Sequence, residues 1–298
     1  MADPAITFAI PYYSNLGFLK RAIDSVLGQT LNDWRIVVCD DCNPLEPASD
    51  LVAEYNNPRI SYHRNPQNLG IAGNWNRCIS LARTELVTLL HADDELRPEY
   101  TRIMLDLYRA YPTYSAYFCR ADIIDADSRP KFSFPDYVKR FLNPCEHRIA
   151  SVEGEQGLVS LLKGSYIMCP SVCYNRAHIE DECFSSKWQM VLDLDFFSGL
   201  LFKGKGFIGT PEVGYAYRRH ENNYTVKLTS TMRRFNEEIE LYDLIGRTSV
   251  EKNWFKASSC AKKKSIIKLH LAYLILRNMS TLKFGPVFQE IECLMRIL

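Results

Sequence analysis

Short apolar segments alternate with amphipathic segments through roughly the first 110 residues, and this alternation constrains the fold more than any other feature. Apolar runs that predict strands lie at residues 6–10, 34–39, 60–64 and 85–90. Segments that predict helices lie at residues 18–27, after a capping Asn15, and at 51–55, 71–82 and 99–110. Strands and helices that alternate at this pitch predict an α/β protein with a doubly wound, mostly parallel sheet flanked by helices.

Two pairs of aspartates follow two of these predicted strands. Asp40-Asp41 comes directly after residues 34–39, and Asp93-Asp94 comes shortly after residues 85–90. In an open α/β sheet the carboxyl ends of the strands line the ligand crevice. Aspartate is also common in turns and at helix caps, so either pair alone could be structural. Two such pairs in one predicted sheet favour a site for a divalent metal and a nucleotide.

Composition excludes several other classes of protein. The net charge of the 298 residues is +1, which gives no overall field to recruit nucleic acid. The ten cysteines are scattered and no basic, apolar leader peptide begins the chain, so we expect reduced thiols in a cytoplasmic protein. Cys39 and Cys42 have C-x-x-C spacing, but strand packing and a loop explain them better than metal or redox use. Residues 266–276, the longest apolar stretch, are too few to span a bilayer.

The regular alternation fades after about residue 114. Predicted strands lie at 116–119, 167–174 and 212–217, and predicted helices at 191–202, 230–245, 262–278 and after Gly285-Pro286. Residues 125–151 are rich in Pro, Asp, Arg and Phe, and we expect them to form a long excursion beside the site.

Seven short motifs occur in an order that resembles the family 2 glycosyltransferases, which are nucleotide-sugar-dependent, inverting enzymes with the GT-A fold. The motifs are Ala9-Ile10-Pro11-Tyr12-Tyr13, Ser25-Val26-Leu27-Gly28-Gln29-Thr30, Val37-Val38-Cys39-Asp40-Asp41, Asn65-Pro66-Gln67-Asn68-Leu69-Gly70 with Gly73-Asn74, Leu89-Leu90-His91-Ala92-Asp93-Asp94-Glu95-Leu96, Leu192-Asp193-Leu194-Asp195 and Tyr217-Arg218-Arg219-His220. The resemblance implies a GT-A domain over residues 1–225, with a nucleotide-binding half at about 1–120 and an acceptor half at about 121–225. Residues 226–298 would be a C-terminal helical extension.

The resemblance assigns nucleotide binding to the first of these motifs. Pro11 and Tyr13 would pack on the base, and Asp40 would accept a hydrogen bond from it, with uracil N3–H the usual donor. Asn68 and Asn74 would contact base or ribose, although turn formation and capping explain them equally well.

The resemblance also implies a metal site. Asp94 would bind Mg²⁺ or Mn²⁺, which neutralises the departing diphosphate, and Asp93 would assist it or face the ribose. Many family members have an acid where this chain has His91, so the ligand set is open at that position, and His91 alone reads more readily as a packed residue.

The remaining implied roles concern phosphate, acceptor and proton transfer. Arg218 and His220 would grip the diphosphate unless they form a solvated basic turn. Trp188 would be a platform for the acceptor sugar, or a packing residue. Asp193 would be the base that deprotonates the acceptor hydroxyl, with Asp195 as its rival, because two positions two residues apart on a helix face different ways.

The sequence therefore predicts a metal-dependent hexosyltransferase that moves a sugar from a nucleotide diphosphate donor, expected to be a UDP-sugar, to a hydroxyl of a glycan or lipid-linked glycan in surface polysaccharide biosynthesis. One alternative is a non-catalytic protein that binds nucleotide sugars or glycans on the same fold, and another is a sugar nucleotidyltransferase. The basic residues 262–264 before residues 266–276 indicate either a docking helix or a peripheral contact with the cytoplasmic face of the inner membrane.

Overall fold

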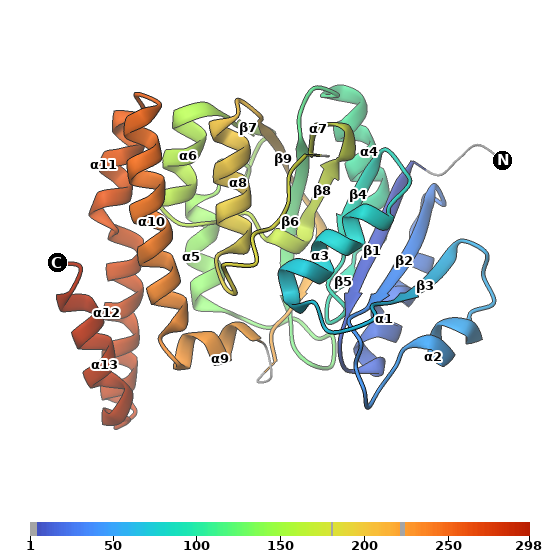
Figure 1. The fold of residues 1–298 in the computed structure, drawn as a ribbon, viewed down its shortest axis with the longest axis horizontal. Helices are drawn as coiled ribbons and strands as arrows, with labels where there is room; N and C mark the ends of the chain where they lie inside the picture. The colour runs from blue at the N-terminus through green and yellow to red at the C-terminus, as the bar shows by residue number, and fades with distance from the viewer. Residues whose placement is uncertain (1–4, 180, 221–223) are drawn as a thin grey trace. The chain divides into compact units, whose positions relative to one another are not determined.

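The computed structural model describes residues 5–179, 181–220 and 224–298. Contacts within the chain define two compact units, and each unit is assembled from several stretches of sequence. The first unit comprises Met1–Val152, Tyr166–Ser186 and Lys205–Arg219, and the second comprises Glu153–Ser165, Lys187–Gly204 and His220–Leu298. The stretches of the two units alternate along the chain (Figure 1). The division into two domains at residue 225 stays a prediction.

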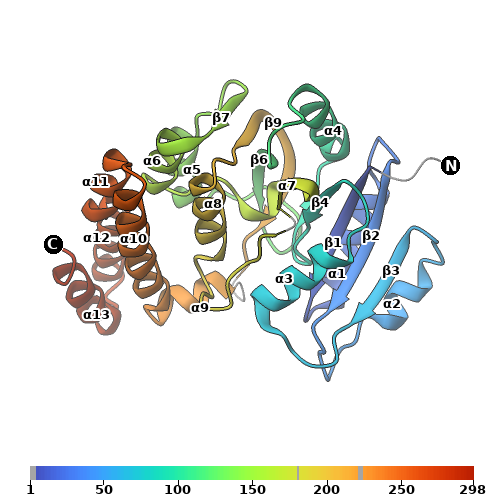
Figure 2. The same ribbon diagram turned by 45° about the horizontal axis from the view of Figure 1, so that its top comes forward.

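The first unit contains, within the described residues, a nine-stranded sheet. Its strands are β1 (Ile6–Tyr12), β2 (Trp34–Asp40), β3 (Ile60–Arg64), β4 (Leu86–Leu89), β5 (Glu95–Leu96), β6 (Ala116–Ile124), β7 (Ala150–Val152), β8 (Val172–Asn175) and β9 (Phe207–Arg218). They are ordered β3-β2-β1-β4-β8-β6-β9-β5, and β7 also pairs with β9 (Figure 2).

The sheet is parallel in its N-terminal half and mixed beyond it. Strands β3, β2, β1 and β4 pair in parallel, as the alternating pattern predicts. Strand β8 then runs antiparallel to both β4 and β6, and β5 and β7 run antiparallel to β9. The α/β fold with flanking helices is confirmed, but "mostly parallel" holds only for the first half, because the irregular sequence after residue 114 has no strand–helix rhythm to fix strand direction.

The first unit has six helices among its described residues, and the first four of them lie at predicted positions. They are α1 (Leu16–Leu27), α2 (Ser49–Glu54), α3 (Gly70–Leu81), α4 (Tyr100–Ala110), α5 (Phe134–Leu142) and α7 (Arg176–Ile179), with a 3₁₀ turn at Cys169–Ser171. Asn15 caps α1 as predicted, because its Oδ1 accepts a hydrogen bond from the backbone N–H of Phe18 at 3.0 Å. The predicted excursion at 125–151 contains α5 and β7, which have no clear signature in that Pro- and Asp-rich sequence.

Strand β1 runs two residues beyond its predicted end and includes Pro11. Its pairing with β4 ends at Ala9, opposite Leu89, so Pro11 lies where β1 has a parallel partner on one side only. A proline lacks the N–H needed in the middle of a sheet but is tolerated at such an edge. The chain therefore carries Tyr12 and Tyr13 past the end of β4.

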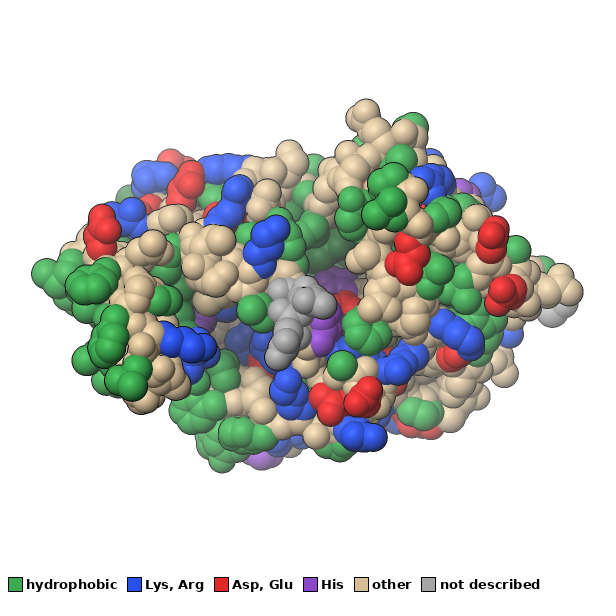
Figure 3. Space-filling view, turned by 90° about the horizontal axis from the view of Figure 1, so that it is seen from below, with side chains coloured by type: hydrophobic (Ala, Val, Ile, Leu, Met, Phe, Trp, Pro, Cys, Tyr) green, Lys and Arg blue, Asp and Glu red, His purple; other side chains and the backbone are tan. Residues whose placement is uncertain are grey.

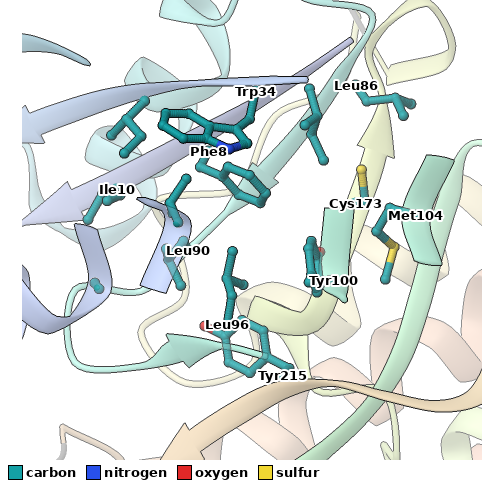
Figure 4. Packing of buried hydrophobic residues seen from close by; sticks show 14 of the residues in the cluster. Phe8, Ile10, Trp34, Leu86, Leu90, Leu96, Tyr100, Met104, Cys173 and Tyr215 are labelled. Atoms are coloured by element: carbon teal, nitrogen blue, oxygen red, sulfur yellow. The ribbon is translucent and has the colours of Figure 1, made fainter. Parts of the chain in front are cut away.

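The core of the first unit lies between the sheet and its helices. Phe8 of β1 and Tyr100 of α4 are fully buried, with ring centroids 5.8 Å apart (Figure 4). Tyr215 of β9 packs on the other side of Tyr100, with ring centroids 6.3 Å apart. This aromatic contact connects the N-terminal parallel strands to β9, which is more than one hundred residues away in sequence.

The second unit is helical within its described residues. Its helices are α6 (Gly154–Leu162), α8 (Leu192–Phe202), α9 (Tyr224–Ser230), α10 (Arg233–Glu251), α11 (Phe255–Lys263), α12 (Ser265–Ser280) and α13 (Phe284–Met295). The single helix predicted at 262–278 is in fact split, because Lys264 has a left-handed backbone with φ 48° between α11 and α12. No described helix is long and apolar enough to cross a membrane.

The contact between β9 and β6 gives a test of this packing. A Cβ atom on Gly209 of β9 would lie 2.3 Å from the Phe118 ring and 2.6 Å from the Cys145 sulfur. We expect Gly209→Ala to lower the free energy of unfolding by about 1–3 kcal/mol, measured by urea denaturation, because the buried ring must move. Gly199→Ala in α8 is the matched control, since nothing lies within 4 Å of its added Cβ, and it should be neutral or stabilising by up to about 1 kcal/mol.

Candidate active site

The parallel half of the sheet brings both aspartate pairs to the same edge. Strands β2 and β4 lie on either side of β1 and run parallel to it, so their carboxyl ends are neighbours. Asp40 ends β2 and Asp41 follows it, while residues 91–94 follow β4. The sequence-based expectation that the two pairs share one sheet edge is therefore confirmed.

Asp40, which is predicted to contact the base, accepts hydrogen bonds from other residues of the protein. Its side chain is fully buried, and Oδ2 accepts hydrogen bonds from the Tyr62 hydroxyl at 2.6 Å and from Arg64 Nη1 at 3.3 Å. Backbone N–H groups of Asn43 and Ala48 complete its set of donors. These four donors hold the loop after β2 against β3, and the contact of Asp40 with the base stays a prediction.

Asp41, the second acid of the pair, accepts hydrogen bonds from the protein through one of its two carboxylate oxygens. Its Oδ1 accepts from Asn65 Nδ2 and from the backbone N–H of Leu69, each at 2.8 Å, and Oδ2 takes part in neither bond. Asn65 also donates to Asn74 Oδ1 at 3.0 Å, and Asn74 Nδ2 donates to the Cys39 carbonyl at 3.1 Å. Asn74 thus uses both polar atoms of its amide to support the loop that holds Asp41, and its contact with base or ribose stays a prediction.

The residues after β1 separate into a core tyrosine and an exposed one. Tyr12 is fully buried, and its hydroxyl donates to the Glu46 carbonyl at 2.8 Å. Tyr13 is 49% exposed, as a ring that stacks on a base must be. Pro11, the last-but-one residue of β1, is half-buried. Asn68 forms a local turn, since its Oδ1 accepts from the Gly70 N–H at 2.9 Å before α3.

His91, Asp93 and Asp94 form a cluster that can hold a metal ion. One ligand atom from each lies within 4.8 Å of the others, and His91 Nδ1 is 4.0 Å from Asp94 Oδ2. Within the described part of the chain, the buried His91 Nε2 has no hydrogen-bond partner. A buried nitrogen without a partner is costly and is one of the observations that mark a ligand site. The residues present therefore fit a bound cation, and His91 joins the candidate ligands that the sequence had left open.

Burial and the repulsion between neighbouring acids perturb the titration of this cluster. Desolvation raises the pKa of Asp94 well above its usual value, and the neighbouring negative charge of Asp93 raises it further. Desolvation lowers the pKa of His91, which keeps its imidazole neutral and able to bind a metal. A cation would relieve the cost of two adjacent carboxylates, one of which is buried.

Strand β9 holds Asp94 in place from the far side of the sequence. The Tyr215 hydroxyl donates to Asp94 Oδ2 at 3.0 Å, and the backbone N–H of Arg218 donates to Oδ1 at 2.7 Å. The pairing of β5 with β9, with Glu95 opposite Ala216, sets this register.

Arg218 is an internal anchor of the acidic loop, and its contact with a diphosphate stays a prediction. Its side chain is 1% exposed. Nε donates to the Asp93 carbonyl at 2.6 Å, Nη1 donates to the Asp125 carbonyl at 2.6 Å, and Nη2 pairs with Glu95. A guanidinium with all three nitrogens engaged inside the protein fastens the acidic loop to the chain after β6.

The remaining predicted residues belong to the second unit. Asp193 lies in the first turn of α8 and is half-buried, and its Oδ1 accepts from the Leu194 N–H at 2.8 Å. Burial raises the pKa of Asp195, against a hydrogen bond from Trp188 that lowers it. Trp188 is 3% exposed, so it packs inside this unit, and its role as an acceptor platform stays a prediction. His220 follows β9 and is half-buried.

Two residues of this site escaped the sequence-based assignments. The sequence presents Asp41 only as the second acid of a pair. The several asparagines in residues 65–74 are the signal that could have identified it, because the Asn65 amide donates to Asp41 and orients its carboxylate. Tyr215 was predicted only as part of a strand, and nothing in its sequence surroundings shows that it meets Asp94 across 121 positions.

The fold and this site define the class of protein. Residues 7–155, half of the chain, match the family described as Glycosyl transferase family 2. The chain belongs to that family, as the seven motifs predicted.

Relatives share parts of the chain. The Putative colanic acid biosynthesis glycosyl transferase WcaA of Escherichia coli (strain K12) is 31% identical over 143 residues, which cover 46% of this chain and 50% of that protein. The Succinoglycan biosynthesis protein ExoO of Rhizobium meliloti (strain 1021) is 33% identical over 103 residues, covering 35% of this chain and 29% of that protein. The matches thus span half the length of these curated relatives or less.

Solved structures share the GT-A fold over nearly the whole chain, which confirms the predicted fold. TarS 1–349 of S. aureus, in complex with UDP-GlcNAc, has a TM-score of 0.70 at 14% identity, covering 98% of this chain and 79% of that one. The mannosyltransferase PcManGT from Pyrobaculum calidifontis, in complex with GDP-Man and Mn²⁺, has a TM-score of 0.58 at 14% identity, covering 99% of this chain and 85% of that one. At such identities the likeness shows the fold alone.

The excursion after β6 is pinned beside the site by one ion pair that can be tested. Asp136 of α5 accepts two hydrogen bonds from the Arg219 guanidinium, at 2.7 and 2.8 Å. Burial alone would raise the pKa of Asp136, but the hydrogen bonds and charge of Arg219 outweigh it and hold the pKa below its usual value. We expect Asp136→Asn to lower the free energy of unfolding at pH 7 by about 1–3 kcal/mol, because Arg219 loses its charged partner.

A depressed folded-state pKa gives stability that is present above the unfolded pKa and is lost as pH falls through the folded pKa. The difference between wild type and Asp136→Asn should therefore shrink below about pH 4 in urea denaturation series. Asp127→Asn is the matched control, since Asp127 lies in the same excursion with a side chain that is 67% exposed. Equal effects of the two substitutions at pH 7 would contradict the anchoring role of Asp136.

Proposed function

We propose that this protein transfers a sugar from a nucleotide diphosphate donor to a hydroxyl of a glycan or lipid-linked glycan, with inversion at the anomeric carbon, in the synthesis of a surface polysaccharide. One observation carries the proposal, namely the cluster of His91, Asp93 and Asp94 at the same sheet edge as Asp41. The colanic acid and succinoglycan relatives support the polysaccharide setting. We favour a UDP-sugar, in keeping with the UDP-GlcNAc bound by TarS.

Each residue of the first unit has a separate task in this proposal. Tyr13 stacks on the base through its exposed ring, and the carboxylate of Asp41 accepts the base N–H, the role first expected of Asp40. Asp94, with Asp93 and His91, holds Mg²⁺ or Mn²⁺, and such an ion supplies charge neutralisation for the leaving diphosphate. Tyr215 and the Arg218 N–H orient Asp94 so that its carboxylate does not have to reorganise.

The carboxylate of Asp193 removes the proton from the acceptor hydroxyl as that oxygen attacks the anomeric carbon. Asp195 remains its rival, because burial raises the pKa of Asp195 toward the range that suits a general base. His220 is proposed to approach the diphosphate.

Calorimetry and turnover separate the metal ligand from the base. We expect Asp94→Asn to abolish the part of UDP binding that depends on Mn²⁺, because it removes a charged ligand of the cation. Asp193→Asn should leave UDP binding unchanged and reduce sugar transfer by about 10²–10⁴-fold, since it removes only the proton acceptor. Asp195→Asn is the matched control, and a loss of transfer confined to Asp195→Asn would move the base to that residue.

Donor hydrolysis distinguishes the rival functions in the same preparation. Slow, metal-dependent release of a nucleoside diphosphate from a nucleotide sugar supports the transferase. Release of pyrophosphate from a nucleoside triphosphate would instead indicate a nucleotidyltransferase. Tight donor binding with neither reaction would indicate a non-catalytic binding protein. Titrations with UDP, GDP and TDP, each with and without Mn²⁺, identify the base of the donor.

Substitution of the two acids after β2 tests which one reads the base. Asp41→Asn should weaken UDP binding by about tenfold or more, because it replaces a charge-assisted hydrogen bond to the ligand. The loss of thermal stability should be smaller than for Asp40→Asn, because the amide oxygen can still accept from Asn65 and the Leu69 N–H. Asp40→Asn should mainly lower stability, because Asp40 is buried among four internal donors. If Asp40→Asn proves as stable as wild type and loses UDP affinity while Asp41→Asn keeps it, the original assignment to Asp40 is right.

A further inference from the structure

Charge is segregated at the C-terminal end of the second unit. Between Glu251 and Glu290 the sequence has no Asp or Glu, although the whole chain has 35 of them against 36 Lys and Arg. The same stretch holds eight basic residues, namely Lys252, Lys256, Lys262, Lys263, Lys264, Lys268, Arg277 and Lys283. Lys264 is buried and pairs with Asp243 of α10, while most of the others are exposed. The α11–α13 segment is therefore strongly positive in a chain that is nearly neutral.

Helix α13 carries an apolar stripe that faces away from its packing contacts. Phe284, Phe288, Ile291 and Met295 follow one another at spacings of four, three and four, so they share one face of the helix, and they are 53%, 74%, 42% and 66% exposed. The buried residues of α13, Val287, Glu290 and Cys293, lie on a different face. One exposed acid, Glu292, lies beside the stripe.

Helix α12 repeats this arrangement. Its buried face consists of Ile267, Leu271, Leu274 and Asn278. Leu269 and Leu276, seven residues apart, are 66% and 69% exposed and lie on the opposite face.

The turn between the two helices exposes one apolar residue and one basic residue. Leu282 is 76% exposed and stands beside the exposed Lys283. Asn278 Nδ2 donates to Glu290 Oε1 at 2.7 Å, and this buried hydrogen bond fixes the two helices against each other. Figure 3 shows hydrophobic side chains gathered over α12 and α13, which Figure 1 labels, with basic side chains beside them. We call the exposed apolar residues of α12, α13 and their turn the hairpin surface.

We propose that the hairpin surface docks on the headgroup region of an anionic lipid bilayer. Large exposed apolar groups of this kind mark an interaction site and are rare on an unpartnered protein surface. The basic residues around the hairpin decide between occupants. A second copy would bring the same positive surface against itself in a two-fold contact, which is repulsive. An anionic membrane offers hydrocarbon for Phe284, Phe288 and Leu282 and negative headgroups for Arg277 and Lys283, and the two contributions add.

Vesicle flotation with the full chain tests the proposal. The wild type should float with phosphatidylcholine vesicles that contain phosphatidylglycerol and should stay unbound with phosphatidylcholine alone. Phe288→Ser should weaken binding by about tenfold, because a ring leaves the acyl boundary. Phe141→Ser is its matched control, since Phe141 of α5 is also 74% exposed but lies in the first unit. The control should bind like wild type.

Substitutions of basic residues test the electrostatic contribution to vesicle binding. The double substitution Arg277→Gln with Lys283→Gln should weaken binding by roughly twentyfold, and high salt should weaken wild-type binding in the same direction. Lys20→Gln with Arg109→Gln, two exposed basic residues of the first unit, is the charge-matched control and should change little. Circular dichroism melting of each variant verifies that the exposed positions were changed without unfolding.

Three results would overturn the proposal. The first is failure of the folded wild type to bind phosphatidylglycerol vesicles. The second is equal binding by Phe288→Ser and Phe141→Ser. The third is a dimer of the wild type in analytical ultracentrifugation that Phe288→Ser converts to monomer without lipid, since a second copy would then cover the hairpin surface. None of these results depends on sugar transfer, so the proposed enzymatic function can fail or hold independently.

Discussion

The hydrogen bonds that strand β9 makes to Asp94 are the interaction on which the candidate site depends. A nearly fully buried carboxylate beside a second acid is unfavourable unless donors meet it. Tyr215 and the Arg218 N–H supply those donors from a strand that pairs with the two-residue strand β5 directly after the acidic loop. The guanidinium of Arg218 then ties the same loop to the segment after β6. The Arg218 side chain thus holds the acidic loop in place through hydrogen bonds within the protein.

The first half of the fold could be read from the sequence because local signals suffice there. Buried parallel strands read as continuous apolar runs, and the Asn15 cap is a local hydrogen bond. The aspartate pairs follow from the rule that ligands bind at carboxyl ends of parallel strands. The direction of β8 and the presence of α5 and β7 depend on contacts with distant strands, chiefly β9, and no local pattern reports such contacts.

The candidate site was predictable at the level of segments and not of atoms. Asp40 and Asp41 are equivalent by sequence, and only the donors from Tyr62, Arg64 and Asn65 distinguish the acid that builds the loop from the acid with an oxygen to spare. Trp188 is ambiguous in the same way, because an aromatic residue before a helix can either pack or present its ring. The burial of Trp188 favours packing, and burial is a property of the whole fold that the sequence does not show locally.

The imidazole at position 91 changes the electrostatics of the proposed metal site. A carboxylate there would place three negative charges within the 4.8 Å cluster, and each would raise the pKa of its neighbours further above the value set by burial. A histidine whose own pKa is lowered by desolvation adds a ligand without adding charge. The loop can then fold with less repulsion before any cation arrives, although the cluster attracts a divalent ion less strongly. Mg²⁺ prefers an all-oxygen, octahedral shell, and a mixed set of one nitrogen and two carboxylates would suit Mn²⁺ better. The departure from the family pattern would therefore reduce repulsion within the acidic loop and weaken its attraction for a divalent ion.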